Sequence, residues 1–177
     1  IISRGYNSDA IALNSAFGLT VGGASGAWNV VYFHDHGDGP TQDQIHLFTT
    51  SIPNGAWRYI GFTRDDTAKT VSLYVGDGVT VSLIETWGYA FSPDGGTDPS
   101  NLLVVGNEAG GSGGVFPAFV GPFVGTIEEH YIWTRKLSLT EHQDAMRGSP
   151  STTSLILNCL MGNSPEVDLS TSGAVGN

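Results

Sequence analysis

The strongest constraint on the fold is a hairpin pattern near the middle of the chain. Apolar side chains occupy every second position of residues 71–75 and again of residues 79–83. A period of two is typical of a strand with one buried face. Gly76-Asp77-Gly78 lies between the two segments and supplies the turn of a hairpin. The sequence therefore predicts an antiparallel hairpin over residues 70–84.

The rest of the chain repeats this organisation, with short apolar segments ended by turn residues. The 25 glycines and 8 prolines suit a chain with many tight turns. Further strands are expected over residues 11–21, 28–33, 45–49, 57–63, 102–105, 123–133 and 155–160, the last of these ending the fold.

One helix is expected, near the C-terminal end. Ser138-Leu139-Thr140-Glu141 is a capping box, in which Ser138 is the N-cap and Glu141 reaches back to it. The helix should run to about Arg147 and stop at Gly148-Ser149-Pro150. Many short strands and one small helix predict an all-β fold. We expect an antiparallel two-sheet sandwich with one short helix, formed as a single domain over residues 1–177.

Composition and net charge limit the classes of molecule that this protein is expected to bind. Hydrophobic residues make up 40% of the chain and charged residues 14%, which is unlike the balance of disordered chains. The formal net charge of −10 disfavours nucleic acid and anionic membranes. No apolar run approaches the roughly 20 residues of a membrane span, so no membrane insertion is expected. Cys159 is the only cysteine; it lies in an apolar run and is expected to be a buried, inert thiol.

Five segments together resemble a known family. Residues 57–65, 71–78, 103–107, 123–133 and 137–141 resemble, in this order, successive pieces of the laminin-G-like domain, a member of the concanavalin-A-like jelly rolls. The resemblance implies the jelly-roll fold and a lectin-like role. His130 stands where the family usually has an aliphatic residue. The strand that normally precedes the equivalent of Ile2-Ser3-Arg4 is missing, so we expect an incomplete sheet or a strand supplied from elsewhere.

The tail carries a second resemblance. Residues 164–170 (SPEVDLS) resemble a phrase that accompanies such domains in bacteriophage virion proteins. This implies a place on a virion surface or another extracellular location.

Carboxylate motifs give little support for an enzyme. Laminarinase-type glucanases share the jelly roll and need two glutamates flanking an aspartate on one strand. The nearest match is Glu166-Val167-Asp168, which lacks the second glutamate. Glu128 and Glu129 are adjacent, so on a strand they would face opposite sides. If Glu129 faces the core with Ile127, it needs a buried hydrogen-bond donor. No catalytic residue is assigned.

A polar loop offers a candidate metal site. His34 and His36 have the His-x-His spacing that some zinc and copper sites use, but spacing indicates no further ligands. Calcium would prefer the oxygens of Asp35 and Asp38. The family resemblance favours calcium, since related folds often hold it at the rim. A solvated hairpin loop is the alternative interpretation.

Aromatic residues offer a candidate ligand site. Trp87, Tyr89 and Phe91 alternate within a stretch rich in turn residues. Aromatic rings can hold sugar rings through their apolar faces. Packing into the core is the alternative for Trp87 and Tyr89, and the expected fate of Trp57 and Trp133.

These observations predict a non-catalytic binding or structural domain. It would act in adhesion or decoration on a virion or cell surface, and recognise a glycan or dock on a neighbouring structural protein. A homo-oligomer or a capsid-bound state is compatible with this role. The alternatives are a purely architectural module and a jelly-roll glycoside hydrolase or polysaccharide lyase acting on a polysaccharide.

Overall fold

The computed structural model describes ten segments of the chain. They are residues 2–4, 17–22, 27–34, 44–53, 55–91, 103–105, 109–110, 118–119, 126–160 and 167–168. The chain divides into two compact units. Unit 1 comprises Ile1–Ala56, Asp66–Val71 and Trp87–Val124, and unit 2 comprises Trp57–Asp65, Ser72–Thr86 and Gly125–Asn177. The single-domain organisation stays a prediction.

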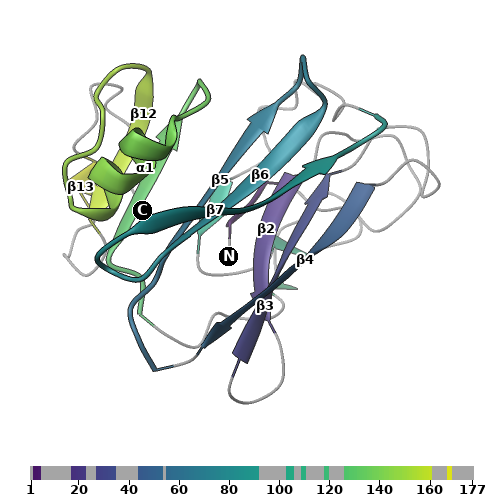
Figure 1. The fold of residues 1–177 in the computed structure, drawn as a ribbon, viewed down its shortest axis with the longest axis horizontal. Coiled ribbons are helices and arrows are strands. Elements are labelled where there is room, and N and C mark those ends of the chain that lie inside the picture. Colours follow the sequence, from purple (N-terminus) through teal and green to yellow (C-terminus); the bar gives the residue numbers. More distant parts are fainter. Residues whose placement is uncertain are drawn as a thin grey trace. The chain divides into compact units, whose positions relative to one another are not determined.

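Unit 1 contains a five-stranded antiparallel sheet in the order β4-β3-β2-β1-β8. Its strands are β1 (Ile2–Arg4), β2 (Phe17–Gly22), β3 (Ala27–His34), β4 (Gln44–Pro53) and β8 (Leu103–Val105). Figure 1 shows β2, β3 and β4 side by side. Two short strands, β9 (Ala109–Gly110) and β10 (Ala118–Phe119), pair with each other.

The first strand is an interior strand of this sheet. Ile2 pairs with Leu19 of β2 on one side and with Val105 of β8 on the other. Both sides of β1 are therefore hydrogen-bonded within the chain itself, although the sequence led us to expect missing pairing near this strand. A further strand supplied from elsewhere stays a prediction.

Strand β4 is twice as long as the expected strand over residues 45–49. Its even-numbered residues face inward, with Phe48 and Ile52 buried. The opposite face is open, because Ile45 is 69% exposed and Leu47 is 55% exposed. The sequence could not separate these two faces, since both carry apolar residues.

The predicted hairpin is confirmed in unit 2. Strands β5 (Tyr59–Asp65), β6 (Thr70–Gly76) and β7 (Val81–Gly88) form a sheet in that order. The first two residues of β6 and the last two of β7 are assigned to unit 1, and the rest of the sheet to unit 2. The turn between β6 and β7 is closed by a bond from Asp77 N–H to the Thr80 carbonyl of 3.2 Å. The Asp77 carboxylate also accepts the backbone N–H groups of Val79 and Thr80 at 2.9 Å.

Strand β6 is buried on both faces, and the expected half-buried pattern is wrong for it. Val71 and Leu73 are fully buried, as the alternation predicted. Tyr74, on the other face, is buried too. The cause is a neighbour that the alternation does not report: the imidazole of His142 stacks on the Tyr74 ring, with ring centroids 3.9 Å apart.

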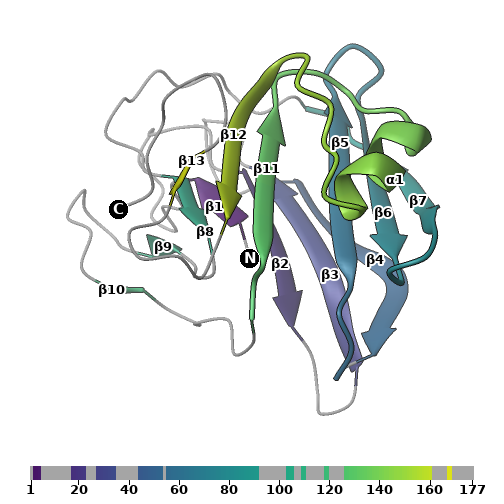
Figure 2. The same cartoon turned by 90° about the vertical axis from the view of Figure 1, so that its left-hand side faces the viewer.

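A second sheet of unit 2 departs from the expected strands near the C-terminal end. It consists of β11 (Glu129–Trp133), β12 (Leu155–Leu160) and β13 (Val167–Asp168), and Figure 2 shows β11 beside β12. The strand expected over 123–133 begins only at Glu129; residues 126–128 are not in a strand, and residues 123–125 lie outside the described part. β12 is not the last strand, because β13 pairs with it.

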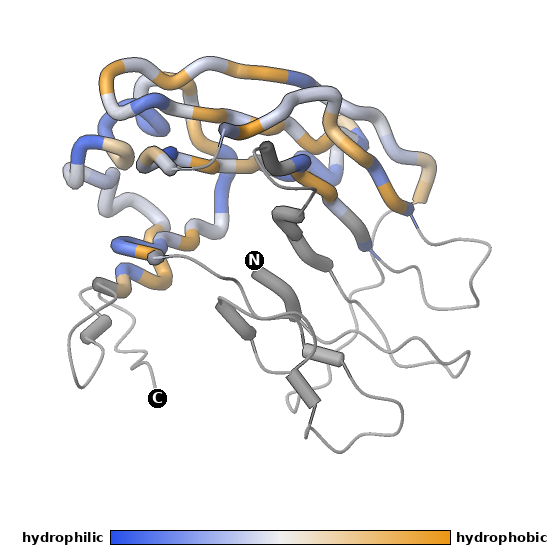
Figure 3. The backbone as a smooth tube through the Cα atoms, turned by 90° about the horizontal axis from the view of Figure 1, so that it is seen from below, coloured by the Kyte–Doolittle hydropathy of each residue, from blue (hydrophilic) through white to orange (hydrophobic). Residues whose placement is uncertain are grey.

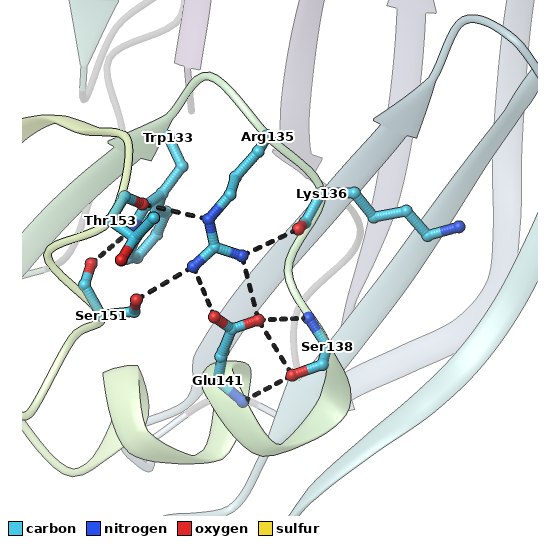
Figure 4. A network of polar contacts seen from close by, with 7 residues as sticks. All are labelled: Trp133, Arg135, Lys136, Ser138, Glu141, Ser151 and Thr153. Atoms are coloured by element: carbon cyan, nitrogen blue, oxygen red, sulfur yellow. Dashed lines mark hydrogen bonds and ion pairs between the residues drawn. The ribbon is translucent and has the colours of Figure 1, made fainter.

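Helix α1 (Leu139–Met146) has the predicted limits. Ser138 is the N-cap, and both bonds of the capping box are present with Glu141 (Figure 4). Arg147 is the C-cap, and Gly148 follows with a positive φ of 72°. The side-chain amide of Gln143 joins the helix to the hairpin, since it accepts Val81 N–H at 2.8 Å and donates to the Val79 carbonyl at 2.9 Å.

The capping box gives a first prediction. Ser138→Ala removes the acceptor of Glu141 N–H and should lower the free energy of unfolding by about 1 kcal/mol. Thr140→Ala, at an exposed position in the first turn, is the matched control and should change it by less than about 0.5 kcal/mol. Urea denaturation of both variants measures the difference. Equal losses would show that the cap contributes nothing.

The described structure is mostly β, with small antiparallel sheets and one short helix. Hydrophobic and hydrophilic residues alternate at short intervals along the coloured part of the backbone in Figure 3. Among the described residues, no helix has the length and apolar character needed to cross a bilayer. Cys159 is buried, as expected.

Candidate functional site

The predicted ligand residues meet in one group of aromatic and imidazole side chains in unit 1. We call this group the Trp87 cluster; its members are the side chains of Tyr32, His34, His46, Phe48, Trp87 and Tyr89, and His34 ties the backbone carbonyl of Phe91 to it. Strands β3 and β4 position the first four. The register pairs Tyr32 with His46, so these two side chains share one face of the sheet.

Trp87 lies at the centre of ring contacts. The His46 imidazole stacks on it in parallel, with centroids 4.8 Å apart and an interplanar angle of 6°. Tyr32 and Tyr89 approach it at 6.2 Å and 6.0 Å in tilted arrangements. Trp87 nevertheless keeps part of its surface exposed. The contacts therefore fix the orientation of a ring that solvent still reaches.

His34 is buried at the end of β3, so its expected place in a loop is wrong. Its Nε2 lies 2.7 Å from the Phe91 carbonyl and its Nδ1 lies 3.1 Å from the Tyr32 hydroxyl. A carbonyl only accepts, so Nε2 carries a proton and donates to it; in the neutral imidazole Nδ1 then accepts from the Tyr32 hydroxyl. Both ring nitrogens are thus used in bonds that hold the cluster together.

Tyr89 and Phe91 differ in exposure. Tyr89 is 5% exposed, and its hydroxyl donates to an Asp66 carboxylate oxygen at 2.7 Å. Phe91 is 42% exposed, while its backbone carbonyl is held by His34. Tyr89 therefore acts as a buried support, and the partly exposed Trp87 and the exposed Phe91 are the rings that a ligand can reach.

Of the four candidate metal residues, the structure describes only His34. Asp35, His36 and Asp38 lie outside the described residues. His34 fits a metal poorly, because a metal would have to displace the Tyr32 hydroxyl or the Phe91 carbonyl from its ring. In the described part of the chain, no group of three or more His, Cys, Asp or Glu side chains is arranged to hold a metal ion.

Of the two faces that the sequence left open for Glu129, the structure has it on the exposed one. Glu129 is exposed, and its neighbour His130 is the buried residue, at 7% exposure. The Tyr131 hydroxyl donates a hydrogen bond to Glu129. Of the glucanase-like motif, Val167 and Asp168 form β13, and Glu166 lies outside the described residues.

Comparison with protein-family models, with curated proteins and with solved structures finds no match to this chain.

Unit 2 contains a buried tyrosine–histidine group that sequence reasoning missed. The Tyr59 hydroxyl lies 2.7 Å from His142 Nδ1, and the same imidazole stacks on Tyr74. Burial lowers the pKa of His142 to about 4 and raises that of Tyr59. A Cβ on Gly61 would lie 2.8 Å from His142 Nδ1, so only glycine leaves room for this bond. The group anchors α1 on β5 and β6.

These imidazole contacts could not be predicted from the sequence. His142 lies on an ordinary capped helix, and nothing local distinguishes a buried from an exposed histidine there. His46 lies in a strand whose two faces both carry apolar residues. Its place beside Trp87 follows from the pairing of β4 with β3, which no local pattern reports.

Proposed function

We propose that this chain is a non-catalytic, lectin-like binding domain that recognises a neutral glycan through Trp87 and Phe91. Its setting in this proposal is a virion or another extracellular surface, where it serves in adhesion or decoration. The observation that supports the proposal is that Trp87 and Tyr89 contact each other in one cluster, to which His34 ties the Phe91 backbone, while Trp87 is partly exposed and Phe91 is exposed.

The chemistry of the cluster suits a sugar. A sugar ring offers apolar C–H faces that stack on aromatic rings, and hydroxyls that need polar partners. Here Gln44 lies at the margin, where its side-chain oxygen accepts Ala90 N–H at 3.2 Å. The Trp87 ring is held by its stack with His46, and the Phe91 backbone by its bond from His34, so little order has to be created on binding. A net charge of −10 favours neutral over acidic glycans.

The laminin-G-like jelly roll is part of the same proposal. Support comes from the antiparallel sheets, the hairpin of β6 and β7, and a capped helix at the position that the resemblance implies. The phage-like tail phrase supports a virion setting. A neighbouring structural protein or a second copy of the chain is the alternative partner.

The proposal predicts a selective loss of binding. Trp87→Ala should weaken binding of the glycan found on an array by about tenfold or more, because the fixed stacking surface is lost. Trp57→Ala is the matched control: Trp57 is 59% exposed in unit 2 and should leave binding unchanged. Binding is measured on the array and by titration calorimetry, after circular dichroism has shown both variants folded.

Three outcomes would contradict the proposal. Equal losses in the two variants would place the glycan elsewhere. A flat array together with a measured trimer or capsid association would favour a purely architectural module. Depolymerisation of a polysaccharide by the purified chain would show a glycoside hydrolase or lyase.

A further inference from the structure

Helix α1 is held on the strands of unit 2 by the side chain of one buried histidine. His142 is 2% exposed, and its Nδ1 shares a hydrogen bond of 2.7 Å with the Tyr59 hydroxyl of β5. Its ring stacks on the Tyr74 ring of β6. A Cβ on Gly61 would lie 2.8 Å from the same Nδ1, so β5 leaves no room there even for a methyl group. The imidazole is thus enclosed between its own helix and two strands.

The next residue of the helix covers the backbone of the hairpin. The side-chain amide of Gln143 accepts Val81 N–H at 2.8 Å and donates to the Val79 carbonyl at 2.9 Å. Arg147, the C-cap, donates to the same carbonyl at 3.4 Å. These bonds exist only while α1 lies on the sheet. The two backbone groups of the hairpin are therefore covered or uncovered together with the docking of the helix.

A second proton on His142 finds no acceptor in this enclosure. Its Nε2 is buried and has no hydrogen-bond partner among the described residues. The titratable groups around the ring in this part of the chain are the phenols of Tyr59 and Tyr74 and the carboxylate of Glu141 on the same helix. Glu141 is itself paired with Arg135, and burial outweighs its attraction, so the pKa of His142 is lowered to about 4. A charged imidazole is therefore favoured only where the ring reaches water.

We propose that His142 is an acid-sensitive anchor, whose protonation releases α1 from β5 and β6 before the sheet itself unfolds. The release is local because the strands keep their own bonds: Asp77 N–H and the Thr80 carbonyl close the hairpin turn, and β11 pairs with β12. Small elements open more readily than the core of a domain. The opened state exposes the Val81 N–H and the Val79 carbonyl, which the helix covers at neutral pH. The anchor lies in unit 2 and does not depend on the proposed glycan site.

Hydrogen exchange of the full wild-type chain at pH 7 and pH 5 tests the anchor. After correction for intrinsic exchange rates, the opening constant of the α1 amides and of Val81 N–H should rise by about twentyfold at pH 5. This factor follows from a His142 pKa of 6.5 in the open state and about 4 in the closed state. The amides of β6 should stay more protected than those of α1 at both pH values. Equal protection of α1 and β6, or an opening constant that does not change with pH, would overturn the proposal.

A pair of histidine variants assigns the effect. His142→Asn keeps a hydrogen-bonding group near Tyr59 but cannot titrate, so the opening constant of Val81 N–H should change by less than about twofold between pH 7 and pH 5. His130→Asn is the matched control, because His130 is also buried and has a lowered pKa but lies on β11. This variant should keep the response of about twentyfold. A response that survives His142→Asn, or that disappears with His130→Asn, would contradict the assignment to His142.

Discussion

Acidification from pH 7 to pH 4 should lower the free energy of unfolding by about 3 kcal/mol for each of two buried histidines in unit 2. His130 is 7% exposed and His142 is 2% exposed. Burial lowers the pKa of each to about 4, from an ordinary value of 6.5. Among the described residues, neither Nε2 has a hydrogen-bond partner. A second proton on either imidazole would create a buried and poorly solvated charge.

The direction in which stability changes with pH follows from the pKa values of the folded and unfolded chains. Above pH 6.5 both folded and unfolded chains carry neutral imidazoles, and stability is complete. Between pH 6.5 and pH 4 the unfolded chain binds protons that the folded chain does not, so stability falls by about 1.4 kcal/mol per pH unit and per histidine. Below pH 4 the folded protein is protonated as well, and these two groups cause no further loss.

The neighbours of His142 limit this effect only slightly. The hydroxyl of Tyr59 and the ring of Tyr74 face it from β5 and β6, and neither carries a charge at neutral pH. Glu141 on the same helix favours the protonated form, but burial outweighs it. Protonation should therefore loosen α1 from the sheet.

Urea denaturation at several pH values measures the loss. His142→Asn keeps an acceptor near the Tyr59 hydroxyl and cannot titrate, so its stability should fall about half as steeply between pH 6.5 and pH 4. An NMR titration of the two imidazoles checks the pKa values directly. A wild-type profile that is flat across this window, or imidazoles that titrate near pH 6.5, would refute the account.

Local signals in the sequence predicted the elements that depend on neighbouring residues alone. Helix α1 is such an element, because its cap is formed within Ser138–Glu141 and its end at Gly148. The β6–β7 hairpin is another, because its turn is closed by Asp77 and Thr80. Contacts between distant strands could not be predicted in this way. The burial of His34 requires Phe91, which is 57 positions further along the chain.

The candidate site, too, could be predicted from the sequence only where local pattern determines it. The alternation of Trp87, Tyr89 and Phe91 pointed to the right stretch of chain, but alternation alone could not separate the buried support from the exposed ring. The hydroxyl of Tyr89 is bound by Asp66, from a turn more than twenty residues earlier. The role of His46 depends on strand register, and Trp133 is partly exposed although core packing was expected for it.

The clearest test of what strand order adds to sequence pattern compares two leucines of the hairpin. Leu73 and Leu83 occupy equivalent apolar positions of the alternating pattern. β6 lies between β5 and β7, and Leu73 is fully buried, whereas β7 lies at the end of this strand order and Leu83 is 50% exposed. Burial and the cavity left behind, rather than residue type, should therefore decide the cost of truncation.

Leu73→Ala should lower the free energy of unfolding by about 3 kcal/mol, within the range of about 2–5 kcal/mol found for buried leucines. Leu83→Ala removes the same atoms from a half-exposed site and should cost less than about 1 kcal/mol. Urea denaturation with an unchanged m-value measures both. Losses of similar size would mean that β7 is covered in solution by something that binds over Leu83, and analytical ultracentrifugation of the wild type would then show whether a second copy of the chain covers it.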